Sequence, residues 1–314
     1  TATFSATVAE SKTISATVSG VTVAQTATVT VAPGSASQLA FTVPPSTTTA
    51  GVVISAPVQV TAQDAFGNIL PGFTGSVTVS IGTNPGGGTL AGTRQVAAVA
   101  GVATFTTLSI DKSGTGYTLL AAAAGLVSGA STAFAITPGP VSASQSTLVA
   151  TPTTLTASNG ASAATITVTA RDALGNAIAG APVTFAATGT GNTLSPATVA
   201  TSASGAATAT LSATVAESKT ISATVSGVAI TQTATVTVAP AGVSQLGFSV
   251  EPSSSVAGVT IAPAVRVSAR DPFNNTVPSF TGTVTVSIET NPGGGTLAGT
   301  RQVAAVAGVA TFST

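Results

Sequence analysis

Three short motifs bring an aspartate and an asparagine together at matching places in the chain. They are DAFGN, DALGN and DPFNN, at residues 64–68, 172–176 and 271–275. The oxygens of Asp and Asn suit calcium, but a calcium site needs several convergent oxygens and each motif offers one carboxylate. The alternative is a turn in which Asp and Asn hydrogen-bond the local backbone and a glycine adopts positive φ. We therefore predict turns here, with no metal site.

Two other patterns are compatible with phosphate binding or with catalysis. The segment GGGTLA at 86–91 fits a loose dinucleotide-binding pattern, but no helix follows it and no GK[ST] is present, so we interpret it as a flexible strand connection. Serine and lysine are neighbours at 11–12, 112–113 and 218–219. Adjacent residues on a strand point to opposite faces, whereas Ser-Lys catalysis needs the lysine aimed at the serine. We expect surface lysines, and neither catalytic nor cofactor-binding residues.

The remaining candidates are an aromatic ring, rows of hydroxyls and one sequon. Tyr117, the only tyrosine, could stack on a sugar, but its place in DKSGTGYTL is typical of a tyrosine corner, whose hydroxyl bonds to upstream backbone. Asn274 begins the only N-x-T sequon, which its counterpart Gly67 lacks, so we expect no structural role for sugar there. Rows of threonine predict solvated strand faces, with O-linked sugar or lateral packing as alternatives. These are Thr165, Thr167, Thr169, Thr233, Thr235 and Thr237.

The composition excludes most catalytic chemistry. Cysteine, histidine, methionine and tryptophan are absent, and eight basic residues balance eight acidic ones at only 5% charged residues. The commonest acid–base, thiol and metal-binding groups are therefore missing. No basic cluster exists to bind nucleic acid or anionic lipid, and the longest apolar run, 119–127, falls far short of the roughly 20 residues that span a bilayer. We predict no enzyme, no cofactor, no nucleic-acid partner and no membrane insertion.

The chain repeats itself after 207 residues. The string SATVAESKTISATVSGV begins at Ser5 and again at Ser212, and NPGGGTLAGTRQVAAVAGVATF begins at Asn84 and again at Asn291. A constant offset means that no insertion separates the copies, which is typical of an array of modules. Proline and glycine clusters divide this array into two complete modules and two partial ones. The predicted segments are 1–33 (C-terminal part of a second-type module), 34–138 (first type), 139–240 (second type) and 241–314 (N-terminal part of a first-type module).

The two partial segments correspond to parts of the complete modules. Residues 1–33 align with 208–240, and residues 241–314 align with 34–107. Neither part can close a sandwich core alone, because it would leave an apolar sheet face and an unpaired edge in water. We expect the parent chain to continue on both sides, with strands supplied by a neighbouring chain as the alternative.

Alternation of apolar and small polar residues predicts strands throughout. TITVTARD at 165–172 is one example, and period two means one buried face. No stretch carries a sustained helical pattern with caps, so the fold class is all-β. Turn signals every 8–12 residues in modules of about a hundred residues predict tandem immunoglobulin-like sandwiches in an elongated array. We expect strands near 37–43, 56–63, 74–82, 88–98, 101–109, 115–123 and 131–137, then 146–151, 163–171, 181–188, 192–200, 205–213, 219–226 and 231–239.

Both module types resemble known families. The run STLVATPTTLTASNGASAATITVTARDALGNAIAGAPVTF, followed by SGAATATLSATV and QTATVTV, resembles the bacterial Ig-like domains of the invasin and intimin family. The first type, with QLAFTV, VQVTAQDAFGNIL, GVATFTTLSIDKSGTGYTL and STAFAIT, resembles Ig-like repeats of very large secreted bacterial proteins. The resemblance implies non-catalytic sandwiches, extracellular or on the cell surface, that space or present something.

These observations favour a mechanical role. Short linkers with proline leave little freedom between modules, and sparse charge offers little repulsion between chains. We expect a structural segment of a long bacterial fibre or surface filament whose partners are copies of itself or neighbouring modules. The alternative is an adhesin stalk that presents or contributes to a glycan-binding or other surface-ligand site, with Phe66 and Tyr117 as loop residues to test. A spacer in a secreted polysaccharide enzyme is a third class, which requires a catalytic domain elsewhere.

Overall fold

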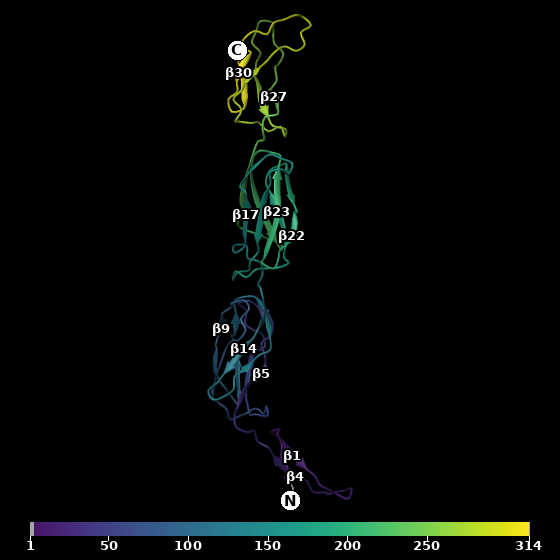
Figure 1. Ribbon diagram of the computed structural model, residues 1–314, viewed down its shortest axis with the longest axis vertical. Coiled ribbons are helices and arrows are strands. Elements are labelled where there is room, and N and C mark those ends of the chain that lie inside the picture. The colour runs from purple at the N-terminus through teal and green to yellow at the C-terminus, as the bar shows by residue number, and fades with distance from the viewer. Residues whose placement is uncertain (1–2, 314) are drawn as a thin grey trace. The chain divides into compact units, whose positions relative to one another are not determined.

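The computed structural model describes residues 3–313, and within them every regular element is a strand (Figure 1). The all-β prediction is therefore confirmed. No helix in this part of the chain is long and apolar enough to cross a membrane. Contacts divide the chain into two compact units, one of Thr1–Pro140 with the turn Asp172–Asn176, the other of Val141–Arg171 with Ala177–Thr314. Three separate apolar cores lie within the ranges 39–136, 148–238 and 267–312.

The first sandwich closes over the core of residues 39–136. One sheet has the order β10-β8-β14-β15 and the facing strands run β11-β7-β5, with β13-β16-β6 and β12-β9 beside them. In β8 the period-two pattern places Val77 and Val79 inside, and Ser76, Thr78 and Ser80 outside. Its strands are β5 (Gln38–Val43), β6 (Thr48–Thr49), β7 (Val58–Gln63), β8 (Ser76–Ile81), β9 (Leu90–Ala91), β10 (Gln95–Ala97), β11 (Val102–Phe105), β12 (Ser109–Ile110), β13 (Gly114–Tyr117), β14 (Leu119–Ala122), β15 (Gly129–Ala130) and β16 (Phe134–Thr137).

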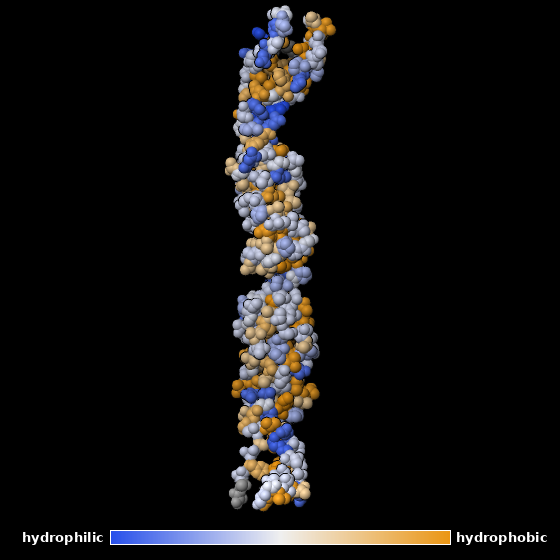
Figure 2. All heavy atoms as spheres, turned by 90° about the vertical axis from the view of Figure 1, so that its right-hand side faces the viewer, coloured by the Kyte–Doolittle hydropathy of each residue, from blue (hydrophilic) through white to orange (hydrophobic). Residues whose placement is uncertain are grey.

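The second sandwich packs the sheet β17-β19-β23-β21 on the sheet β18-β26-β24-β20-β22, with β25 paired to β24. Its core contains many aliphatic side chains, alanines and a single buried phenylalanine, Phe185, so close packing of small residues replaces large aromatic rings. The outer threonines at 165, 233, 235 and 237 are exposed, and those at 167 and 169 are half-buried. Figure 2 shows pale and orange residues intermixed over the visible face. The strands are β17 (Thr147–Thr151), β18 (Thr154–Thr156), β19 (Ala164–Thr169), β20 (Pro182–Ala187), β21 (Asn192–Ser195), β22 (Thr198–Ala200), β23 (Ala206–Ala213), β24 (Ser218–Val225), β25 (Val228–Ala229) and β26 (Ala234–Ala239).

The two flanking segments repeat parts of these sandwiches. In the N-terminal one, β1 (Ser11–Ile14) pairs with β4 (Ala27–Thr30), and β2 (Thr17–Val18) with β3 (Val21–Thr22). In the C-terminal one, β27-β28-β31 reproduces β5-β7-β11, including the irregularity in the first pair of strands. The C-terminal strands are β27 (Gln245–Val250), β28 (Val265–Arg270), β29 (Thr283–Thr285), β30 (Gln302–Ala304) and β31 (Val309–Phe312).

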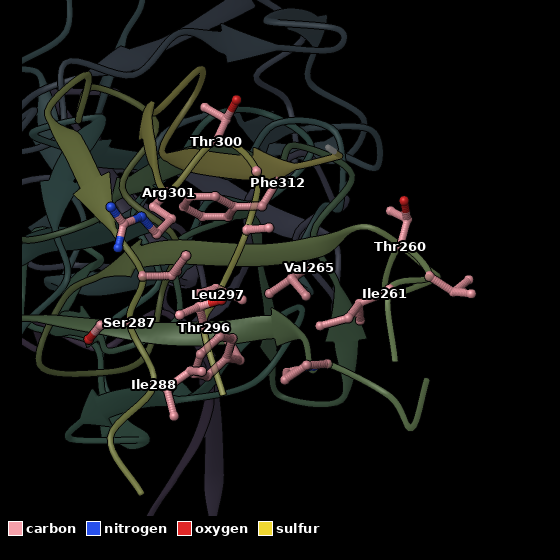
Figure 3. A pocket seen from close by; sticks show the side chains of 17 residues that line it. Thr260, Ile261, Val265, Ser287, Ile288, Thr296, Leu297, Thr300, Arg301 and Phe312 are labelled. Atoms are coloured by element: carbon pink, nitrogen blue, oxygen red, sulfur yellow. The ribbon is translucent and has the colours of Figure 1, made fainter. Parts of the chain in front are cut away.

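An open groove lies on the apolar face of the C-terminal segment. Val265, Leu297 and Phe312 line it (Figure 3). In the first sandwich their counterparts, 207 residues earlier, are all buried in the apolar core. The groove lining is largely apolar, with Arg301 as its one charged side chain. It is therefore an uncovered core face rather than a site built from polar groups.

Three of the expected strands are each divided between two sheets. One is 115–123, where β13 pairs with β16 and β14 pairs with β8. The range 192–200 splits because Pro196 interrupts it, and proline has no N–H to donate to a ladder; β21 then pairs with β23, and β22 with β20. The range 88–98 splits at Gly92, whose φ is 94°, so that β9 pairs with β12, and β10 with β8. The short strands β6 and β18, which pair in parallel with β16 and β26, were not expected, because two or three residues carry no readable alternation.

Candidate functional site: aspartate turns and asparagine bridges

The three Asp/Asn motifs are turns closed by the aspartate carboxylate. In the first, Asp64 Oδ1 accepts the N–H of Phe66 and of Asn68, both at 2.9 Å, and Oδ2 accepts Asn68 Nδ2 at 2.8 Å. Gly67 has a φ of 84°, a region in which glycine carries no steric cost. The turns at 172–176 and 271–275 repeat these bonds. The turn interpretation is confirmed at all three places.

The same carboxylate also holds the linker that precedes each module. Oδ2 of Asp64 accepts the N–H of Gly34 at 2.8 Å. Each carboxylate thus receives four N–H donors, which direct positive charge at the oxygens that a cation would need. Within residues 3–313, no group of three or more acidic side chains could hold a metal ion. The equivalent linker bonds run from Gly139 to Asp172 and from Ala241 to Asp271.

These donors keep the aspartates ionised. The Asn68 side chain, helped by three backbone N–H groups, lowers the pKa of Asp64 to about 2. For Asp172 and Asp271, burial opposes ionisation, but the bonds from Asn176 and Asn275 and from the backbone outweigh it and lower the pKa of each carboxyl. The turns are therefore built around a charged acceptor, and charge-assisted hydrogen bonds are the stronger kind.

A pH dependence follows from these lowered pKa values. A carboxyl whose pKa is lower in the folded state stabilises that state fully above its ordinary value of 3.8, and the contribution is lost as the pH falls through the folded value. We expect the melting temperature to fall between pH 4 and pH 2, with Asp64 losing its contribution near 2. Thermal unfolding followed by circular dichroism from pH 6 to pH 2 checks this. A melting temperature that is constant down to pH 2 would contradict it.

The asparagine of each turn reaches a backbone segment that precedes its own module. Asn275 Nδ2 donates to the carbonyl of Thr214 at 2.7 Å, and its Oδ1 accepts the N–H of Ala216 at 2.9 Å. One side-chain amide thus pairs with a donor and an acceptor, as a neighbouring strand would. We call this pair of bonds an asparagine bridge, and the backbone it meets the receiving segment. The same bridge joins Asn68 to Thr7 and Ala9, and Asn176 to Asp111 and Ser113.

An apolar side chain two residues after each aspartate accompanies the bridge. Phe273 packs against the core of the second sandwich. Leu174 lies so close to Gly51 that a Cβ on this glycine would be 2.9 Å from Leu174 Cδ1. Phe66, whose preceding segment offers only four short strands, is 69% exposed. The turn therefore offers its preceding segment both a polar and an apolar contact.

Two of the other candidates have structural roles, as expected, although one detail differs. The Tyr117 hydroxyl donates to the carbonyl of Lys112 at 2.9 Å, which confirms the tyrosine corner. Glycines 86 and 88 connect strands, but they also pack closely around that hydroxyl, where a side chain at Gly86 would overlap it. These glycines are therefore required by close packing as well as by the connection.

The expectation of surface lysines is wrong for Lys219, which is 0% exposed. Its ammonium donates to the carbonyl of Thr190 at 2.6 Å and pairs with Glu217. Burial is tolerated because a buried charge with a partner and hydrogen bonds is compensated. A signal was present in the sequence: Glu217 and Lys219 are two residues apart, and therefore lie on the same side of an extended chain. Ser218 between them is exposed, as the opposite-face argument predicts.

Comparison with known proteins addresses the second sandwich directly. The family model described as invasin, domain 3, matches residues 142–241. The second sandwich is therefore similar to domain 3 of invasin. The resemblance read from its sequence is thereby confirmed, and an extracellular or cell-surface location is what this resemblance implies. No curated protein matches the chain.

Several solved structures are similar to this chain beyond its invasin-type sandwich. The Escherichia coli adhesin FdeC is similar over 81% of this chain and 81% of its own, with a TM-score of 0.50 and 20% identity. InvD of Yersinia pseudotuberculosis covers 79% of this chain and 73% of its own (TM-score 0.44, 20% identity). Invasin, described as a bacterial integrin-binding protein, covers 81% of this chain and 52% of its own (TM-score 0.39, 20% identity). The first of these supports the Ig-like fold.

Proposed function

We propose that this chain is a non-catalytic stalk segment of an adhesin-type bacterial surface protein, in which asparagine bridges restrict the movement of consecutive modules. The observation that carries the proposal is the recurrence of one turn and one bridge at three places in the sequence. The invasin-type sandwich and the similarity to an adhesin support the class of protein. The absence of histidine and cysteine from the sequence supports a role without catalysis.

The bridge is suited to this role because all of its hydrogen bonds form at the module boundary itself. An unrestrained linker lets neighbouring modules move freely, and interfaces between domains of one chain are commonly small. Two hydrogen bonds to backbone, together with the linker bond to the aspartate, fix three points of the chain at each boundary. A stalk restrained in this way holds whatever it carries at a distance from the cell without a large apolar interface.

Replacement of Asn275 tests the proposal. The chain has no cysteine, so spin labels can be placed uniquely at exposed Thr208→Cys and Thr285→Cys. In Asn275→Ala we expect a broader label-to-label distance distribution in double electron–electron resonance, because the bridge to Thr214 and Ala216 is lost. Asn291→Ala is the matched control: Asn291 makes a similar pair of bonds, but only within its own turn. Equal distributions in both variants and in the parent chain would refute the stalk restraint.

Assembly into a filament through copies of this chain is a second proposal, supported by the low charge. With 5% charged residues, little electrostatic repulsion opposes side-by-side contact. We expect self-association that changes weakly with salt, and sedimentation velocity at low and high ionic strength measures it. A chain that remains monomeric at high concentration in both would exclude the filament and leave the stalk unaffected.

A further inference from the structure

A receiving segment is loop backbone, so an asparagine can bridge to it only if its carbonyl and N–H are held in place. In the first sandwich the receiving segment is 111–113, and Asn176 binds Asp111 O and Ser113 N–H, both at 3.0 Å. The residue between them, Lys112, gives its carbonyl to the Tyr117 hydroxyl. Tyr117 is completely buried against Phe134, with ring centroids 6.1 Å apart. The middle of the receiving segment is therefore tied to the core.

A glycine-rich loop completes this support. Gly86 and Gly88 lie against the Tyr117 hydroxyl, and Asn84 closes the loop by bonding Gly88 through both its amide atoms. The next residue, Thr89, donates its N–H to Asp111 Oδ1 at 2.6 Å, so the loop is also bonded to the receiving segment. Burial raises the pKa of Tyr117, which keeps the hydroxyl protonated and able to donate.

The second sandwich also fixes its receiving segment, but with different side chains. Its receiving segment is 214–216, and the buried residue that follows it is Lys219. The Lys219 ammonium donates to Thr190 O, and Glu217 accepts the N–H of Thr190 at 3.2 Å. The backbone N–H and carbonyl of Thr190 are therefore both bonded, which fixes the loop 188–191. Gly191 of that loop accepts the N–H of Thr214 at 3.0 Å. Thr214 is the residue whose carbonyl receives Asn275.

The two arrangements share a plan. A buried polar side chain, three or four residues after the receiving segment, fixes that segment directly or through a glycine-containing loop. Both loops need a glycine, because a Cβ at Gly86 would overlap the Ser113 carbonyl and the Tyr117 hydroxyl, and Gly189 has a φ of 76°. In the N-terminal segment, Lys12 and Glu10 form the same ion pair after the receiving segment 7–9. Unrelated side chains thus occupy one role in the two module types.

We propose that Tyr117 and Lys219 are positioning residues of the module boundaries, each holding a receiving segment in the geometry that the next asparagine needs. This rests on the proposed function, because it assigns these residues to the restraint between modules. A residue that only stabilised its own sandwich would not need to act on the backbone that receives the bridge.

The test uses the full chain with two pairs of spin labels. Thr78→Cys with Thr208→Cys reports on the boundary bridged by Asn176, and Thr208→Cys with Thr285→Cys reports on that bridged by Asn275; all three positions are exposed. Tyr117→Phe removes only the hydroxyl. We expect it to raise about fivefold the fraction of molecules in which the Asn176 bridge is broken, which is the effect of one lost hydrogen bond. The distance distribution at the second boundary should be unchanged. Lys219→Met should do the reverse, so each variant is the control for the other.

The outcomes separate the two proposals. If Tyr117→Phe and Lys219→Met lower the melting temperature but leave both distance distributions unchanged, the residues are merely structural and the positioning proposal fails. If Asn176→Ala and Asn275→Ala also leave them unchanged, the proposed restraint itself fails. Should Lys219→Met not fold, Glu217→Gln removes the ion pair with a smaller change, and the same broadening at the second boundary alone is expected from it.

Discussion

Asp172→Ala is expected to destabilise the turn 172–176 by about 3 kcal/mol, because hydrogen bonds to a charged group contribute more than neutral ones and their buried donors would be left without an acceptor. Asp172 is 2% exposed and accepts from the N–H groups of Gly139, Leu174 and Asn176 and from the Asn176 side chain. Because Asn176 is held by this carboxylate, the bridge to the receiving segment should be lost with the turn.

Amide hydrogen exchange at Leu174 and Asn176 measures this effect residue by residue. Glu289→Ala is the control, since it removes one negative charge from an exposed position. It should leave exchange at the turn unchanged. Asp172→Asn keeps one acceptor oxygen but turns an NH2 group toward the remaining donors. We therefore expect its loss of exchange protection to lie between those of Asp172→Ala and Glu289→Ala. Unaltered protection in Asp172→Ala would show that the carboxylate does not organise the turn.

The turn itself could be predicted from the sequence, but the bridge could not. An Asp-to-backbone turn is local: its donors lie two and four residues away, and the glycine marks the positive φ. The asparagine partners lie about sixty residues upstream, where a single sequence carries no signal of contact. Asn274, with a φ of 71°, shows that the turn survives without its glycine, because asparagine tolerates this region.

The difference between local and long-range hydrogen bonds also explains which buried polar residues could be predicted. Tyr117 could be assigned to a tyrosine corner because the hydroxyl bonds only five residues upstream. Lys219 bonds to Thr190, on a loop distant in sequence. Alternation places Lys219 on the inward face of β24 with Ile221 and Ala223, but it could not show the partners that compensate a buried ammonium. Alternation predicted which side chains of β23 and β24 face inward, since it depends only on neighbouring residues. It could not show that β21 and β22 lie in different sheets.

Phe105→Ala is expected to cost about 4 kcal/mol, because truncation of a buried phenylalanine loses its burial and leaves a cavity. Phe105 is 1% exposed, at the end of β11 opposite Val58 of β7, within the closed core of the first sandwich. Its neighbours in that core are themselves buried and closely packed, so they can relax only partly into the space.

The repeat provides a matched variant in the same chain. Phe312 occupies the equivalent position opposite Val265, after the same sequence VAT, but it is 8% exposed and borders the open groove of Figure 3. Phe312→Ala would widen a space that water already reaches, so only the burial term of about 2 kcal/mol is lost. Hydrogen exchange at Val60 and at its counterpart Val267 reports the two losses separately. Equal losses would mean that the groove is covered in solution as fully as the core of the first sandwich.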